Sequence, residues 1–533
     1  MRKFNINTVY KYDLIIFFLI LFIFSSFSFY NTEPGIDQIR QISWTESLVD
    51  SKYFINFELI KEKGLIYLDE KSFFINLFRT SYSDIGNVFN IFPILLLYLL
   101  NFTTLSSIII FNLTSIFFFS LNTIVAYLIF EKIFSIEIEL KKNKFLKYLL
   151  FITLIPPYLL LYFPLGIHNI SLFFFLLTFL YLIKFNKDKS KYSFLILLFL
   201  TALGIYSHKL NAVLIPSMIM LNFLFLKNYK LMFNYIISLL IIILPVIIII
   251  LLYPETFSST KKFAEIDISF FNYLNNLILW PTNIIKTNGI IIFLFFIFGL
   301  FYLKKNNLIL ITLIIHIVCY IIINSFSTYF IRTNLYITYF ILIVGYYGFC
   351  KIYLTKNAII KFLILLLFFA HLILNFATII GLKNNETVNY IYKSYYNNNG
   401  SIERSLNEIS QLIKENDKLI YFDNQIEDYF KIYQKKIYKE NSLKIKPIKN
   451  LLTLHQFQEF PNLNLIKEND NILLLSLDST RSIVEESIKK LNKNYKYIFN
   501  NCALTLKIIY SNKPVSARSH WIYLDSIKCI KDY

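Results

Sequence analysis

The sequence is poor in the residues that build metal sites and nucleotide-binding loops. Its 533 residues include four cysteines, six histidines and eleven glycines. The chain has no CxxC pair and no cluster of histidine and cysteine, which argues against a structural zinc site. It also lacks a G-x-G-x-x-G fingerprint and a P-loop, so it carries no sequence signature for cradling a soluble nucleotide.

Charge is also scarce over long stretches of the chain. Hydrophobic residues make up 56% of the sequence and aromatic residues 18%, which is outside the range of soluble domains. A helix that crosses a bilayer needs about 20 apolar residues. The pattern predicts a polytopic α-helical membrane protein with about eleven transmembrane helices, at residues 13–30, 103–130, 145–164, 167–185, 193–206, 210–226, 232–253, 289–303, 307–324, 333–353 and 359–380.

The remaining charge is strongly basic and unevenly placed. There are 53 Lys and Arg against 34 Asp and Glu, for a net charge of +19. Lysines cluster at alternate connections between the predicted spans, as the positive-inside rule requires, so this charge does not indicate a nucleic-acid partner. The N-terminus is therefore expected in the cytoplasm and the C-terminal region outside. We expect the first span to be retained rather than cleaved, because no small-residue cleavage site follows it.

Two outer loops interrupt the membrane domain, residues 1–382. The first, residues 31–88, has nine acidic and six basic residues, which makes it net acidic in a basic chain. The second, residues 254–288, contains the apolar stretch FFNYLNNLILWP. We expect that stretch to lie along the membrane interface, with Tyr273 and Trp280 at the level of the lipid headgroups.

Residues 383–533 have the composition of a soluble extracytoplasmic domain. Helical spacing over 401–417, 426–436 and 479–492 alternates with strand-like runs at 418–423, 471–478, 496–499 and 504–510. Alternating helices and strands predict a small α/β domain. Oxidation is feasible outside the cell, so a disulfide between Cys502 and Cys529 is one expectation.

Asp37 is the first candidate for chemistry. It follows the first span by about seven residues, after a Pro34-Gly35 turn, and shares helical spacing with Arg40. A carboxylate near the membrane surface can act as a general base, or hold a divalent cation beside an anionic headgroup. The alternative is an ordinary solvated loop acid.

The arrangement of these segments resembles the polytopic GT-C-type glycosyltransferases, which include the protein O-mannosyltransferases and the lipid A aminoarabinose transferases. The similarity rests on the first span, the outer loop opening with an Asp, and the stretch FPILLLYLL (92–100) entering the second span. Two further stretches support it: LFLTALGIYSHKLNAVLIP (198–216) and FSTYFIRTNLYITYFILIVGYYGF (326–349).

The resemblance implies roles for particular residues. Asp37 would be the catalytic base, and Arg332 would contact the donor phosphate, helped by Lys209 and His208. The family commonly has Asp-Glu where this chain has Asp37-Gln38, which leaves metal use (Mg²⁺ or Mn²⁺) and acceptor class open. Asp69-Glu70 is the runner-up for the base. Glu255, Glu265 and Asp267 are equal candidates for a second acid, and His168 is interpreted as a polar cap on a short turn.

The resulting hypothesis is a cell-membrane enzyme. It would transfer a sugar from a polyprenyl-phosphate donor in the bilayer to a glycolipid, glycan or protein acceptor on the outer face. Three alternatives stay open: an O-antigen polymerase or ligase, a membrane transporter, and a non-catalytic scaffold.

Overall fold

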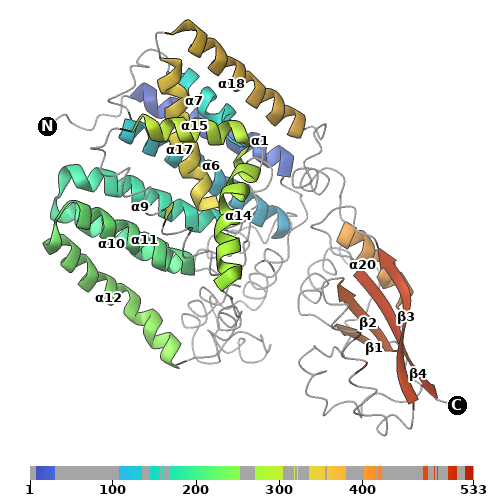
Figure 1. The fold of residues 1–533 in the computed structure, drawn as a ribbon. Helices are drawn as coiled ribbons and strands as arrows, with labels where there is room; N and C mark the ends of the chain where they lie inside the picture. The colour runs from blue at the N-terminus through green and yellow to red at the C-terminus, as the bar shows by residue number, and fades with distance from the viewer. Residues whose placement is uncertain are drawn as a thin grey trace. The chain divides into compact units, whose positions relative to one another are not determined.

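The computed structural model describes residues 8–29, 42, 107–134, 144–156, 159, 168–252, 270–303, 317–318, 321, 335–354, 357–379, 401–413, 418–421, 472–477, 485, 489, 502–512 and 522–531. Helices α1 to α18 belong to one compact unit, and α20 with the four strands belongs to a second. Figure 1 shows both units as ribbons.

All but one of the described helices in the first unit coincide with predicted spans; the exception, Phe270–Asn288, falls in the predicted second outer loop. A helix lies over each predicted span except 307–324, nearly all of which falls outside the described residues. The helices are α1 (Thr8–Phe29), α6 (Ser107–Phe134), α7 (Lys144–Thr153), α9 (Asn169–Asp188), α10 (Lys191–Ser207), α11 (Lys209–Phe225), α12 (Tyr229–Leu252), α14 (Phe270–Asn288), α15 (Ile290–Phe301), α17 (Leu335–Tyr353) and α18 (Ala358–Ile379).

Length and composition identify this unit as membrane-spanning. Among the described residues, four helices are long and apolar enough to cross a bilayer: α6, α9, α17 and α18. A fifth span results if α14 and α15, which meet at a bend of 113°, are taken together. The coarse prediction of a polytopic helical membrane protein is confirmed, while the count of eleven spans remains a prediction.

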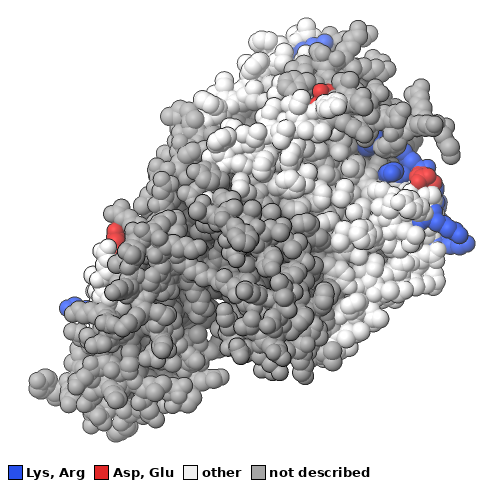
Figure 2. Space-filling view, turned by 180° about the vertical axis from the view of Figure 1, so that it is seen from behind, with Lys and Arg blue, Asp and Glu red and all other residues white. Residues whose placement is uncertain are grey.

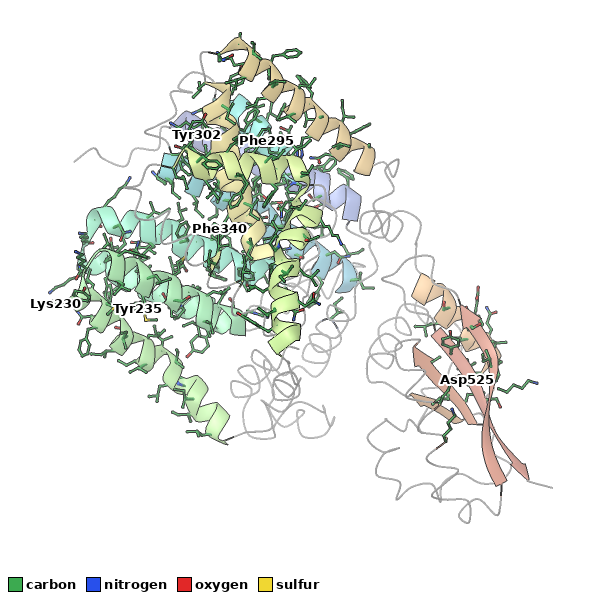
Figure 3. All side chains as sticks on the ribbon, in the orientation of Figure 1. Lys230, Tyr235, Phe295, Tyr302, Phe340 and Asp525 are labelled. Carbon is green, nitrogen blue, oxygen red and sulfur yellow. The ribbon has the colours of Figure 1, made fainter. Side chains whose placement is uncertain are left out.

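Helix α17 forms the centre of the helical unit. Its apolar window is 94% buried, whereas that of α18 is 22% buried, so α18 exposes most of its apolar surface as a lipid-facing helix does. The ring of Phe340 packs edge-on against Phe175 and Phe179 of α9, with centroids 5.8 and 5.6 Å apart. Figure 3 labels Phe340 in this interior position.

Helix α14 covers most of the apolar stretch predicted in the second outer loop. The stretch 270–281 is helical as part of α14, and the Trp280 side chain is only 2% exposed. Trp280 therefore packs against protein, and the placement of Tyr273 and Trp280 at headgroup level stays a prediction.

Tight turns join the helices from α9 to α12. Lys189 and Ser190 connect α9 to α10, and His208 alone connects α10 to α11. Lys189 adopts a left-handed backbone (φ 49°), and its N–H donates to the Phe185 carbonyl at 2.8 Å. A left-handed residue of this kind is a common C-terminal cap, and it ends α9. Such short connections make α9, α10 and α11 antiparallel neighbours in sequence order.

Basic side chains mark the edges of the helical unit. In Figure 2 the blue side chains lie at the edges of the described surface, and the rest of that described surface is largely uncharged. Lys230, at the start of α12, is labelled at such an edge in Figure 3. An uncharged belt between charged ends is the surface expected of a membrane protein.

The second unit contains a mixed four-stranded sheet with the order β1-β2-β4-β3. Strands β1 (Lys418–Tyr421) and β2 (Ile472–Leu477) are parallel, whereas β4 (Ile522–Lys531) is antiparallel to both β2 and β3 (Cys502–Asn512). Helix α20 (Ser401–Leu412) packs on the sheet, and the Tyr510 hydroxyl donates to Glu408 at 2.6 Å. The predicted helix at 401–417 and strands at 418–423, 471–478 and 504–510 are confirmed.

The strand register argues against the disulfide. Cys502 lies opposite Lys531, and Cys529 lies opposite Leu504, so the two cysteines occupy diagonal positions. Diagonal neighbours on antiparallel strands are about 7–8 Å apart, beyond the usual Cα separation of a disulfide. We expect both thiols to be alkylated in denaturant without reductant, as measured by the mass of the intact protein. A mass showing two blocked thiols only after reduction would contradict this register.

Candidate functional site

Polar side chains gather where α9 begins. Asn169 is fully buried, and its Nδ2 donates to Ser115 Oγ of α6 at 3.1 Å. In return, Asn122 Nδ2 of α6 donates to the Asn169 carbonyl at 2.9 Å. Because buried amides in a membrane helix need partners, these bonds fix the N-terminal turn of α9 against α6.

The same cluster extends to α10, α11 and α17. The hydroxyls of Ser171 and Tyr336 lie 2.8 Å apart, which joins α9 to the first turn of α17. Asn211 Nδ2 of α11 donates to the Ser171 carbonyl at 2.8 Å and to Ser207 Oγ of α10 at 3.1 Å. Among the described residues, the buried Asn211 Oδ1 has no hydrogen-bond partner, which leaves one acceptor of the cluster for an ordered water.

Two histidines complete this end of the bundle. The rings of His168 and His208 meet edge to face, with centroids 4.7 Å apart at an interplanar angle of 85°. His168 is 7% exposed, while His208 is half-buried in the connection between α10 and α11. Each imidazole has two ring nitrogens that can donate or accept hydrogen bonds, so the pair adds polar groups to this end of the bundle.

His168 differs from its interpretation as a polar cap. It does take the N-cap position of α9, but its side chain makes no capping hydrogen bond. The ring instead packs against His208, which lies 40 positions further along the chain. The sequence contained no signal for this contact, because it depends on α9 and α10 packing side by side.

Most candidates from the sequence cannot be placed. Lys209 is the first residue of α11 and directly follows His208, so this end of the bundle carries two of the predicted donor-phosphate residues. The other candidates lie outside the described residues: Asp37, Arg40, Asp69, Glu70, Glu255, Glu265, Asp267 and Arg332. Within the described part of the chain, no group of three or more His, Cys, Asp or Glu side chains could hold a metal ion.

Sequence reasoning missed Asn169, Ser171, Asn211 and Tyr336. The available signal was a polar residue inside an apolar run, which is costly in a bilayer and therefore informative. That signal does not distinguish these positions from others such as Asn222, which is equally buried. Only the packing of the helices shows which polar residues meet.

The hydrogen bond between Ser171 and Tyr336 should make a measurable contribution to the stability of the protein. Removing the hydroxyl in Tyr336→Phe should lower the unfolding free energy by about 1 kcal/mol, because Ser171 Oγ then keeps only its 2.8 Å bond to the His168 carbonyl and the bond between α9 and α17 is lost. Tyr339→Phe is a matched control, since the Tyr339 hydroxyl lies a longer 3.4 Å from Thr123. Unfolding of purified protein in mild detergent would measure both, and an equal or larger loss for Tyr339→Phe would contradict this ranking.

No protein-family model matches the chain, and no curated protein matches it. Any function must therefore be argued from the residues and their arrangement.

Proposed function

We propose that the protein is a multi-pass membrane glycosyltransferase that moves a sugar from a polyprenyl-phosphate donor to an acceptor on the extracytoplasmic face. One observation carries the proposal: polar side chains from α6, α9, α10, α11 and α17 meet at the end of the bundle that the lysine pattern predicts to be extracytoplasmic. Polar groups concentrated at one end of an apolar bundle suit a lipid-linked substrate, whose tail stays in the bilayer.

The opposite ends of these helices carry lysines. The Tyr347 hydroxyl donates to the Tyr302 carbonyl at 3.1 Å, and Tyr346 donates to the Lys147 carbonyl at 3.0 Å, near the C-terminal end of α17. Lys351 lies in the last turn of α17 and Lys187 in that of α9. This basic end fits the cytoplasmic side, so the contacts are consistent with the alternation of the loops.

The proposed donor site consists of the polar cluster and two basic residues that lie close in sequence to members of the cluster. Lys209 adjoins His208, and Arg332 precedes the first residue of α17 by three positions. The planar guanidinium of Arg332 suits a phosphate, and both cations would stabilise the phosphate as it leaves the sugar.

Asp37 is the proposed base. It would take a proton from the acceptor hydroxyl or amine, whose oxygen or nitrogen then forms a bond to the anomeric carbon. The bond from that carbon to the donor phosphate breaks, the electron pair leaves with the phosphate, and a single displacement inverts the anomeric carbon. Eleven spans with a cytoplasmic N-terminus would place Asp37 and the α/β domain on the same, extracytoplasmic side.

A transporter is the second candidate, favoured by the break between α14 and α15. Gly289 joins these helices at the 113° bend and has a positive φ of 82°. Discontinuous helices recur at the substrate sites of secondary transporters. Uptake of labelled solute by vesicles containing the wild-type protein, without sugar release, would favour this function.

The donor site is tested by changing two of its proposed residues. Lys209→Ala and His208→Ala should each raise the donor KM by about tenfold, because each removes a phosphate contact worth on the order of 1–2 kcal/mol. Lys230→Ala, on an edge of the unit assigned to the cytoplasmic side, is the matched control and should leave KM unchanged. An unchanged KM in both site variants, with well-folded protein, would remove these residues from the donor site.

A further inference from the structure

Basic side chains concentrate where α9 ends and α10 begins. Lys184, Lys187, Lys189 and Lys191 follow one another within eight positions, and all four are exposed. Lys132, in the last turn of α6, lies close enough to Lys184 and Lys187 for their charges to interact. We call these five lysines the basic rim. Figure 2 shows basic side chains at the edges of the described surface.

Among the described residues, the carboxylates beside the basic rim are fewer than the lysines, and both accept hydrogen bonds from hydroxyls. Asp188 accepts from Ser193 at 2.5 Å and from Ser190 at 3.0 Å. Glu131 accepts from the Tyr127 hydroxyl at 2.9 Å. Within this described part of the chain, two carboxylates lie beside five lysines, which gives a net positive charge, and like charges this close repel one another.

The local backbone holds the rim in place. Lys189 sits at the left-handed end of α9, and the Ser190 hydroxyl caps α10 by accepting from the Ser193 N–H at 3.1 Å. Asp188 bonds both serines, so the turn is braced from both helices. Lys184 reaches over the Tyr181 ring, with Nζ 5.3 Å from the centroid. Because the backbone of this turn is fixed before binding, only the lysine side chains lose conformational freedom when an anion arrives.

We propose that the basic rim binds the phosphate of an anionic glycerophospholipid. The rim lies at the end of α9, a helix that is itself long and apolar enough to cross the membrane, so its cations are at headgroup level. Tyr192, beside the turn, is 74% exposed and is an aromatic residue of the type found among headgroups. Clusters of lysine at such a membrane edge attract anionic lipids, and the charge deficit of the rim is what a lipid phosphate supplies.

This proposal stands apart from the proposed catalytic function. It uses the opposite ends of the helices from the polar cluster, and it requires only that α9 spans the bilayer. Failure of sugar transfer would leave it intact, and failure of lipid binding would leave the transferase proposal intact.

Lipid titration of the full chain in neutral detergent tests the rim. Phosphatidylglycerol and phosphatidylcholine would each be titrated, with retained lipid counted by native mass spectrometry. Wild-type protein should bind phosphatidylglycerol at least tenfold more tightly than phosphatidylcholine. Lys184→Gln with Lys187→Gln should weaken phosphatidylglycerol binding about tenfold or more, whereas the Lys→Arg pair at these positions should retain it.

A charge-matched control separates the rim from general electrostatics. Lys227→Gln with Lys230→Gln removes the same charge at the neighbouring connection, between α11 and α12, and should change binding less than twofold. Equal weakening by both pairs would overturn the assignment to the rim. Equal affinity of wild-type protein for the two lipids would overturn the proposal altogether.

Discussion

Replacing Asp37 by Asn is expected to lower sugar transfer by about 10²–10⁴-fold, the range that general base catalysis contributes. The amide is nearly the same size as the carboxylate but cannot take a proton from the acceptor. Donor KM should stay within about twofold, because the proposed donor contacts come from other residues. The measurement is the initial rate of label transfer at saturating donor, normalised to the amount of folded protein.

Other acids of the same loop provide the controls for Asp37. Asp50→Asn changes the loop charge equally and should retain wild-type rates. Asp69→Asn tests the runner-up base. Full activity in Asp37→Asn together with a large loss in Asp69→Asn would transfer the base to Asp69, and full activity in all three variants would exclude these three aspartates as the base.

Gly348→Ala is expected to produce the largest structural defect, at the crossing of α15 and α17. A Cβ on Gly348 would meet the Phe295 carbonyl oxygen, and would come within 3.0 Å of the Gly299 Cα. These are backbone atoms of α15, so relief requires the helices to separate. Overpacking of this kind costs about 1–3 kcal/mol, and here it would also loosen the helix at the centre of the unit.

Gly345 lies one turn away on the same helix and gives the matched control. A Cβ there would lie 3.4 Å from the Ile292 carbonyl oxygen, which is close to ordinary contact. Gly345→Ala should therefore be tolerated, and it gains about 0.5–1 kcal/mol of helix propensity. Thermal unfolding in detergent compares the two variants. Equal stability of Gly348→Ala and Gly345→Ala would contradict the close approach of α15 and α17.

The helices could be located from the sequence because their signal is local. Runs of apolar residues without charge require a backbone that satisfies its own hydrogen bonds, and the helix does so. The same locality holds for α20 and for β1, β2 and β3. Strand β4 was missed because Asp525 and two lysines interrupt its run, IYLDSIKCIK. In the sheet, Asp525 is fully buried beside Leu524, so burial on this strand does not follow simple alternation (Figure 3).

The polar cluster could not be located in this way. Ser171 and Tyr336 are 165 positions apart, and Asn122 and Asn169 are 47 apart. Each is one polar residue in an apolar helix, and no spacing rule connects them. The order of helix packing decides which of them meet. Charge is the better guide to which helix ends lie together. The lysines at alternate connections predict that His208 and the start of α9 lie at the same end of the bundle.

The most direct test of the central claim is sugar release from a panel of labelled polyprenyl-phosphate sugars by membranes carrying the wild-type chain. We expect label to leave at least one donor, and to stay on it with Asp37→Asn or with Arg332→Ala. Equal expression of the three proteins, measured on the same membranes, is the required control. Failure of well-expressed wild-type protein to release label from any donor would contradict the assignment as a lipid-donor glycosyltransferase.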